Sequence, residues 1–312
     1  MKVVSLKRKP KRHAVGGELL SPLKLLARAA LTAGPGVLWI TVLLILPALV
    51  LFVYSFLSRD TLGDVMMPFT LENYRRFIGF SVFGYDPVYF IIIARSATVA
   101  LVTTVICAIL AYPLAFFIAA HNERWRNILL TLVIVPSWTN LVIRTYALMI
   151  LFTPDSPLST FARSLGLIGT GEGIYPSVFA VYVGTVYTFL SFMVLPIYTA
   201  VERLNWSLVE ASKDLYASHW QTFWQVILPQ TLPGLVAGCI VTLIPAFGIF
   251  VVTDLLGASK VSLIGNVISQ QFSSSRDWPF GATLSFLVMG ISLLTLYLYG
   301  KRMGEKGMRD LL

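Results

Sequence analysis

Few side chains in this sequence could carry out covalent or metal chemistry, and they are not arranged to do so. Cys107 and Cys239 both lie in apolar segments, where such cysteines behave as small core residues. His13, His121 and His219 are scattered along the chain without the spacing of metal ligands. The sequence also lacks the Gly-x4-Gly-Lys-Ser/Thr pattern with which a P-loop holds nucleotide phosphates. We therefore expect a chain that is not an enzyme, holds no metal or cofactor, and does not bind ATP through a P-loop of its own.

Asp254 is the side chain best suited to binding chemistry, because it is the only acidic residue in or at the edge of the long apolar segments. A carboxylate at membrane depth is costly, so it usually faces a cavity or a partner and marks function. In that setting it would pair with the ammonium group of a cationic solute. The alternative is that Asp254 lies at the outer membrane interface, where it is solvated or caps the following loop.

Two aromatic residues inside apolar segments are further candidates for a substrate pathway. Trp138 and Tyr187 could each hold an ammonium group over the face of the ring. The alternative for both is helix packing or a place in the aromatic belt at the membrane interface. Arg144, by contrast, is a poor ligand for a cation, and we expect it to pair with a carbonyl or a carboxylate.

A polar segment at 207–229 separates two long apolar segments, and it has the pattern of two short helices. Ser207 and Glu210 have the spacing of a capping box, which predicts that the first helix begins there. Ser218 and Gln221 repeat that spacing, which predicts the start of the second helix.

A turn and a proline should bound these two helices. The turn is expected at Tyr216–Ala217, between the two apolar periodicities. Pro229 is expected to end the second helix, because proline lacks the N–H that a helix interior requires. Taken by itself, the segment could also be an amphipathic hairpin on the surface with no partner.

The composition is that of a membrane protein. Hydrophobic residues make up 56% of the 312 residues and charged residues 12%, about half the charged fraction of a soluble domain. Windows of about twenty apolar residues recur, each long enough to cross a bilayer core of about 30 Å. The sequence shows none of the alternating segments of about ten residues that mark a transmembrane β-barrel. It therefore predicts an all-α, polytopic membrane protein embedded in the lipid bilayer.

Six spans account for the apolar segments, and together they make one membrane domain at 37–300. A basic N-terminal segment at 1–36, which could include an interfacial helix, precedes this domain, and a basic tail at 301–312 follows it. The polar loop between the fourth and fifth spans covers 202–233. The predicted spans are 37–57, 89–119, 128–152, 176–200, 234–254 and 280–300.

The net charge of +9 does not indicate nucleic acid, because of where the basic residues lie. Most of the 24 Lys and Arg residues fall in the N-terminal segment, the tail and the loops on one side of the predicted membrane domain. Cytoplasmic loops carry such an excess. The sequence therefore predicts that both termini and the loop at 202–233 are cytoplasmic.

The polar loop resembles the EAA loop of bacterial ABC-importer permeases. That motif reads Glu-Ala-Ala, three residues, Gly, nine residues, Ile, one residue, Leu-Pro, and its spacing is kept here. The residue type departs from it with Ser212 for Ala and Tyr216 for Gly, and conservatively with Val226 for Ile. The resemblance implies that the loop, including Asp214 and Leu215, docks into a cleft of the ATPase subunit. The motif positions are occupied by Glu210, Ala211, Ser212, Tyr216, Val226, Leu228 and Pro229.

Other stretches are similar to the permease subunits of spermidine/putrescine importers, over roughly residues 40–300. They include Val135-Pro-Ser-Trp-Thr-Asn-Leu-Val-Ile-Arg-Thr-Tyr146, the run around Asp254-Leu-Leu-Gly257, and Arg276-Asp-Trp-Pro-Phe-Gly281. The resemblance implies the ABC type I importer permease fold in a bacterial inner membrane. It also implies a second permease subunit forming a heterodimer, two copies of an ATPase, and a periplasmic polyamine-binding protein. Polyamine would then move by alternating access, with Asp254 meeting its ammonium groups.

Two other functions remain open at this stage. The same class of transporter could carry another small solute, such as an opine or an aminophosphonate. A channel or a membrane-embedded enzyme would be a different class, but a channel needs no ATPase-docking loop. Paired acids and a nucleophile with a base, which an enzyme would require, are not found in the predicted spans.

Overall fold

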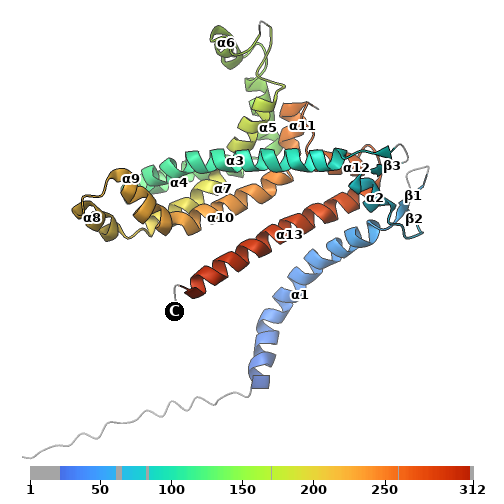
Figure 1. Ribbon diagram of the computed structural model, residues 1–312, viewed down its shortest axis with the longest axis horizontal. Helices are drawn as coiled ribbons and strands as arrows, with labels where there is room; N and C mark the ends of the chain where they lie inside the picture. The colour runs from blue at the N-terminus through green and yellow to red at the C-terminus, as the bar shows by residue number, and fades with distance from the viewer. Residues whose placement is uncertain (1–21, 61–64, 82–83, 170, 259, 310–312) are drawn as a thin grey trace, which may run out of the picture. The chain divides into compact units, whose positions relative to one another are not determined.

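Helices make up most of the structure, a computed structural model drawn in Figure 1. By its internal contacts the chain divides into two units, Met1–Val50 and Leu51–Leu312. The predicted basic segment lies largely outside the described residues, and the described part of the predicted interfacial helix is continuous with the first helix. The structure describes residues 22–60, 65–81, 84–169, 171–258 and 260–309.

Five helices of the described chain are long and apolar enough to cross a membrane, and one bent pair would make a sixth span. This agrees with the predicted all-α membrane class and with six spans. The helices are α1 (Pro22–Tyr54), α2 (Glu72–Ile78), α3 (Val88–Ala119), α4 (Glu123–Trp138), α5 (Leu141–Leu151), α6 (Pro157–Ser164), α7 (Val178–Glu202), α8 (Trp206–Asp214), α9 (His219–Thr222), the π-helix η1 (Phe223–Ile227), α10 (Leu228–Phe247), α11 (Val251–Gly257), α12 (Ile264–Phe272) and α13 (Trp278–Arg309).

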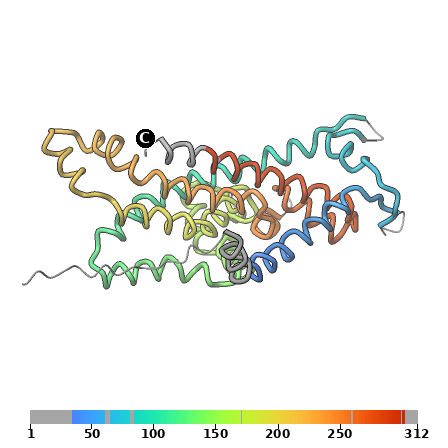
Figure 2. The backbone as a smooth tube through the Cα atoms, turned by 90° about the horizontal axis from the view of Figure 1, so that it is seen from below, coloured from blue at the N-terminus to red at the C-terminus, as the bar shows by residue number. Residues whose placement is uncertain are grey.

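Helices α3, α7 and α10 form the core of the second unit and lie side by side in Figures 1 and 2. Small residues let α10 approach α7 closely, as is common in membrane helix packing. A Cβ added at Gly234 would lie 2.5 Å from the carbonyl oxygen of Pro196, and one at Gly238 would lie 2.7 Å from the sulfur of Met193. Larger side chains at these two glycines would therefore push the helices apart.

The third predicted span is not one straight helix. The chain bends by 94° between α4 and α5. Pro136 lies in the last turn of α4, and the backbone of Thr139 is extended. Asn140 then caps α5, because its side-chain oxygen accepts from the backbone N–H of Val142 at 2.8 Å. Capping by Asn140 starts a new helix in a new direction.

The fifth predicted span, 234–254, is wrong at both ends. Helix α10 already begins at Leu228, and it ends at Phe247. Residues 248–250 break the helix, so that Asp254 belongs to the separate short helix α11. Gly248 ends α10, and α12 packs against the carbonyl groups of this break. Helices α11 and α5 contact each other and project from the α3–α7–α10 core in Figure 1.

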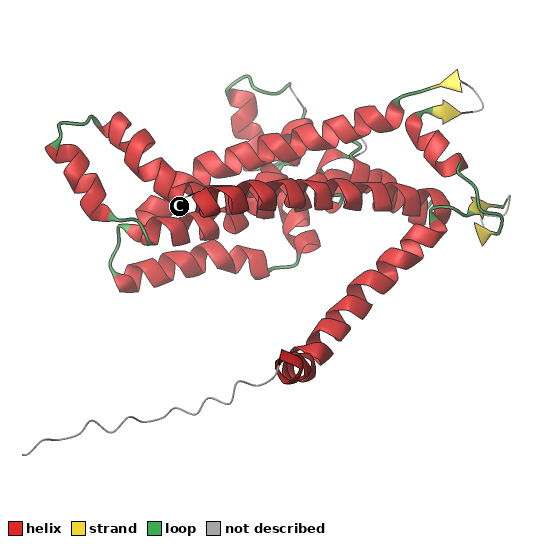
Figure 3. Ribbon diagram, turned by 60° about the horizontal axis from the view of Figure 1, so that its bottom comes forward, coloured by secondary structure: helices red, strands yellow, loops and turns green. Residues whose placement is uncertain are grey.

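Short elements fill the loops at the end of the second unit that holds α2 and α12. Strands β1 (Ser58–Arg59) and β2 (Val65–Met66) form one antiparallel hairpin, and β3 (Phe80–Ser81) and β4 (Gly84–Tyr85) form another, shown in Figure 3. An ion pair of 2.8 Å between Arg76 of α2 and Asp277 joins this region to the start of α13.

The last helix extends the predicted sixth span. Helix α13 starts near α12 and runs back toward the end of the unit that carries α8 and α9 (Figure 1). It is continuous to Arg309, so the predicted tail is helical over most of its length instead of beginning after the span. Helices α3 and α7, by contrast, agree with their predicted spans to within two residues at each end.

Candidate coupling loop and substrate pathway

The predicted coupling loop consists of α8, α9 and η1, and it lies at one end of the α3–α7–α10 core (Figure 1). The second predicted capping box is confirmed, with both bonds between Ser218 and Gln221 present. The first is wrong, because Asn205 caps α8 by accepting from the backbone N–H of Ser207 at 3.2 Å. Asn is as good a cap as Ser, and it occurs earlier in the chain.

Tyr216 takes the left-handed conformation that the motif glycine would adopt. Its φ is +57°, and its backbone N–H donates to the carbonyl of Lys213 at 2.9 Å. A left-handed conformation costs an L-residue about 1 kcal/mol. Tyr216 is 98% exposed and its neighbour Leu215 is 81% exposed, so the second unit does not cover this turn. The predicted turn is therefore confirmed, with a tyrosine in it.

One buried hydrogen bond holds the two short helices of the loop together. The hydroxyl of Ser212, the residue that replaces the motif alanine, lies 3.0 Å from that of Thr222. Both side chains are buried. Glu210, Ala211 and Asp214 are exposed on the same helix. The loop is thus internally fixed, while its acidic face is open to a partner.

Pro229 does not end a helix. It lies at the start of α10, which continues from η1 without interruption, so the predicted helix end is wrong. Proline is tolerated in the first turn of a helix, and the wider π-helical turn just before it accommodates the missing N–H bond. Val226 and Leu228 are half-buried, and Pro229 is exposed.

Asp254 is exposed on α11, directly after the break that follows α10. Its Oδ1 accepts a hydrogen bond from the side-chain amide of Asn266 on α12. Two ion pairs are found among the described residues, and Asp254 is in neither. The carboxylate is therefore held on one side by an amide and has exposed surface with which to meet a cation.

Tyr187 lies against Arg144, not against Asp254. The guanidinium carbon of Arg144 is 5.4 Å from the centre of the Tyr187 ring. Its Nη1 donates to the carbonyl of Pro136 at 2.9 Å, across the bend between α4 and α5. This agrees with the carbonyl partner expected for Arg144. Trp138, at the end of α4, is 78% exposed.

The structure thus brings some predicted residues together and leaves others apart. The coupling residues form one continuous loop. Among the described contacts, none joins Asp254 to Trp138 or Tyr187. Sequence reasoning missed Asn266, although its position three residues after Leu263 is the spacing of a side chain that reaches back to a helix start.

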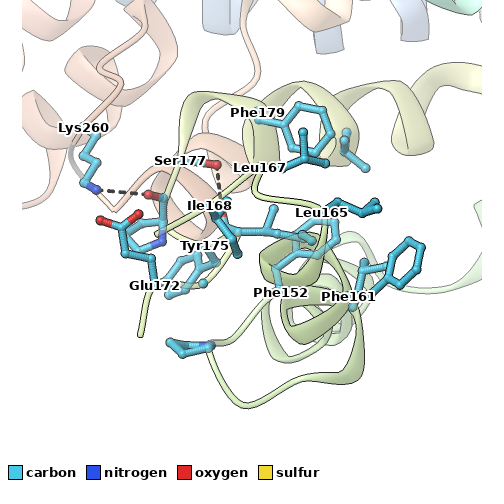
Figure 4. A pocket seen from close by; sticks show the side chains of 17 residues that line it. Phe152, Phe161, Leu165, Leu167, Ile168, Glu172, Tyr175, Ser177, Phe179 and Lys260 are labelled. Carbon is cyan, nitrogen blue, oxygen red and sulfur yellow. Dashed lines mark hydrogen bonds between the residues drawn. The ribbon is translucent and has the colours of Figure 1, made fainter. Parts of the chain in front are cut away.

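The segment at 153–177, which connects α5 to α7, lines a cavity of about 980 Å³ that the sequence did not predict. Figure 4 shows Phe161, Leu165 and Phe179 along it, with Glu172 and Lys260 at one side. The ammonium group of Lys260 donates to the carbonyl of Pro176 at 3.1 Å. The lining is mainly apolar, so it does not have the chemistry of a cation site.

Comparison with known proteins identifies the family. Residues 111–304 match the family model described as a binding-protein-dependent transport system inner membrane component. The spermidine/putrescine transport system permease protein PotB of Salmonella typhimurium strain LT2 is 44% identical over 276 residues, 88% of this chain and 93% of that protein. PotB of Escherichia coli K12 is 43% identical over 86% of this chain and 96% of that protein. PotB of Haemophilus influenzae is 38% identical over 84% of this chain and 89% of that protein.

Solved structures show the same fold. A bacterial ABC transporter involved in the import of the acidic polysaccharide alginate matches with a TM-score of 0.63 at 14% identity, over 91% of this chain and 98% of that one. The same kind of transporter in complex with an alginate pentasaccharide-bound periplasmic protein matches with a TM-score of 0.58 at 15% identity, over 91% and 97%. The predicted importer-permease fold and non-catalytic role are confirmed. The chain belongs to the family of binding-protein-dependent transport system inner membrane components, multi-pass proteins that serve transport.

Proposed function

We propose that this chain is the permease subunit through which a bacterial ABC importer moves polyamine, such as spermidine or putrescine, from the periplasm to the cytoplasm. The observation that carries the proposal is the sequence identity of 38–44% with spermidine/putrescine permeases over at least 84% of the chain. The exposed carboxylate of Asp254 agrees with this cargo, because a polyamine offers ammonium groups that a carboxylate binds by charge-assisted hydrogen bonds. Trp138 is a further candidate, since its exposed ring could hold an ammonium group.

Tyr187 takes a different place in this proposal. Arg144 already lies over its ring, and a second cation near that guanidinium would be repelled. Tyr187 could meet substrate only on the opposite face of the ring. Arg144 fixes the bend of the broken span through Pro136, and its charge keeps the field of the pathway from being uniformly negative.

The loop formed by α8, α9 and η1 would couple transport to an ATPase. Its acidic residues Glu210 and Asp214 and the apolar tip at Leu215 and Tyr216 are exposed together. An exposed mixed patch of this kind on a rigid helix pair suits a protein partner. ATP binding and hydrolysis in two copies of that partner would drive alternating access, while this chain would catalyse no covalent step.

The remaining parts of the proposed importer lie outside this chain. A related second permease would complete the central pathway as a heterodimer, and a periplasmic binding protein would deliver polyamine from outside. Both termini and the coupling loop would be cytoplasmic, as the distribution of Lys and Arg predicts. In support of this orientation, α13 runs from the α12 end of the second unit toward the end that carries the coupling loop (Figure 1).

Transport by the reconstituted complex tests the proposal. Labelled spermidine and putrescine are offered to proteoliposomes that contain the permease pair and the ATPase, with the binding protein outside. We expect uptake that requires ATP and the binding protein and that competes with unlabelled polyamine. Competition by an opine or an aminophosphonate instead, with no polyamine uptake, would assign another cargo. Uptake without ATP would indicate a channel.

A further inference from the structure

The side chain of Asn266 fills a buried position between α12 and the break that precedes α11, and it is only 3% exposed. Its Oδ1 accepts from the backbone N–H of Leu263 at 3.1 Å and shares the hydroxyl proton of Thr253, whose oxygen lies 2.7 Å from it and 2.8 Å from the backbone carbonyl of Phe250. Its Nδ2 donates to the backbone carbonyl of Phe250 at 3.2 Å and to Oδ1 of Asp254. An amide can accept twice and donate twice, so this side chain has no hydrogen-bonding capacity left.

The backbone partners fix the direction in which this amide points. A backbone N–H can only donate, so Leu263 must face the amide oxygen. A backbone carbonyl can only accept, so Phe250 must face the amide nitrogen. The remaining N–H of Asn266 is thereby directed at Asp254, and the network does not allow the reversed orientation.

The start of α12, the helix that carries Asn266, is held against the helix core. At the start of α12, the backbone N–H of Ile264 donates to the hydroxyl of Ser96 on α3 at 2.8 Å, and Ser96 is fully buried. A Cβ at Gly265 would collide with the carbonyl of Gly248, so α12 approaches the break as closely as its backbone allows. Asn266 therefore belongs to a helix, α12, that is fixed against the core, while Asp254 belongs to the short helix α11 that follows the break after α10.

We propose that Asn266 is a positioning residue for transport, and that it holds the carboxylate of Asp254 in the orientation in which it receives the substrate's ammonium group. The inference rests on the proposed function. A carboxylate has about four acceptor positions, so the bond to Asn266 leaves the others free for a cation. A carboxylate that is already oriented loses less freedom on binding, which raises affinity without adding a contact to the substrate.

A double-mutant cycle on the complete importer tests this proposal. The apparent KM and maximal rate of labelled spermidine uptake are measured for Asn266→Ala, for Asp254→Asn and for the two together, at matched amounts of assembled complex. We expect Asn266→Ala to raise KM by about fivefold to tenfold, because the carboxylate loses its orientation. In the Asp254→Asn background the same change should have no further effect on KM, since there is no charge left to orient.

Ser96→Ala is the matched control. It removes a buried hydrogen bond from the start of the same helix without touching Asn266 or Asp254. If Asn266 served only to hold α12, both changes would lower the amount or stability of the complex and neither would raise KM. An equal rise in KM for Ser96→Ala would overturn the proposal, and so would effects of Asn266→Ala and Asp254→Asn that simply add.

Asp254→Glu keeps the test decisive if the alanine variant fails to assemble. Asp254 is exposed on α11, so the fold can accommodate one more methylene group while the charge is kept. The longer side chain displaces the carboxylate from the amide of Asn266, and with it the orientation that the amide provides. KM should then rise although the charge is still present, and an unchanged KM would contradict the positioning role.

The outcomes also separate this inference from the proposed function. Absence of polyamine uptake by the wild-type complex would refute the function itself. Unchanged uptake by Asp254→Asn would remove Asp254 from the pathway while leaving the cargo in place. A loss with Asp254→Asn but an unchanged KM with Asn266→Ala would refute only the positioning role.

Discussion

Asp254 and Tyr216 show how much depends on the surroundings of a single residue. One carries a charge beside a break in a membrane helix, and the other carries a strained backbone at an exposed turn. An acidic residue at the edge of a span has many possible roles, and only the amide beside it indicates an oriented ligand. A tyrosine in place of the motif glycine retains the turn, since its φ of +57° lies in the left-handed region.

The charge of Asp254 can be removed with little change of shape. Asp254→Asn keeps an oxygen that can accept from Asn266, so the local network should survive. In the assembled importer the second permease and the bound substrate would shield this exposed carboxylate from water, and a desolvated contact with an ammonium group is worth about 1.5–3 kcal/mol. Polyamine uptake at low substrate concentration should then fall about tenfold or more, whereas a contact that stays solvated would contribute about 1 kcal/mol or less. Uptake is measured against wild type at matched membrane abundance. A drop of less than threefold would mean that the carboxylates handling the cation come from the partner permease.

The strain at Tyr216 can be relieved without touching the helices. Tyr216→Gly should stabilise the free permease by up to about 1 kcal/mol, because glycine adopts positive φ at no steric cost. Thermal unfolding of the purified permease pair in detergent measures this effect, and the melting temperature should stay level or rise slightly. A fall of several degrees would show that the tyrosine ring contributes more to stability than its backbone costs.

At the scale of elements, the coupling loop is a helix pair fixed from within. The Ser212–Thr222 hydrogen bond and the capping box at Ser218 set its geometry, while Glu210 lies on the open face.

Two of the predicted spans are interrupted by breaks. The 94° bend between α4 and α5 and the interruption after α10 produce two short helices, α5 and α11, that contact each other. The end of the broken fifth span thus becomes the place where Asp254 is exposed.

Reversal of one charge on the open face of α8 should weaken ATPase docking. Glu210→Lys reverses a charge at the centre of α8 and so alters the electrostatic surface offered to the partner. We expect normal insertion but reduced recovery of the ATPase when the permease is pulled down. Asp155→Lys, the same charge reversal at an exposed residue of another loop, is the control and should leave recovery unchanged. Equal ATPase recovery and transport with Glu210→Lys would exclude a docking role.

At the scale of the whole molecule, orientation follows from charge and from the direction of the helices. Lys and Arg are enriched at the two termini and in the loops predicted to be cytoplasmic. Helix α13 runs toward the coupling-loop end of the second unit. The α12 end, with the Arg76–Asp277 ion pair and the two hairpins, would then face the periplasm and the binding protein.

Thiol labelling tests this orientation in intact cells. In a chain without Cys107 and Cys239, single cysteines replace Ser218, Ser274 or Lys306, and an impermeant thiol reagent is added from outside. We expect labelling only for Ser274→Cys, because Ser274 lies at the end of α12 and is exposed. Labelling of Ser218→Cys from the periplasm would invert the proposed topology.

The sequence alone determined the membrane class, the family and the position of the helix pair that we propose as the coupling loop. Apolar segments long enough to span a bilayer have few alternative folds, since each must satisfy its backbone hydrogen bonds internally. Helices α3 and α7 therefore agree with their predicted spans to within two residues at each end. Local capping was predictable where donor and acceptor are three residues apart, as at Ser218 and Gln221.

The tertiary structure decided where spans break and which side chains meet. A hydropathy pattern does not distinguish a straight helix from one that turns by 94°, because mean hydropathy depends on composition and not on the direction of the chain. It also cannot place Asn266 beside Asp254, since the pairing depends on α12 folding back against the carbonyl groups after α10. Long-range contacts such as Ile264 with Ser96 on α3 hold that return in place. The amide that orients the candidate carboxylate is thus a product of packing between distant segments, which local spacing does not encode.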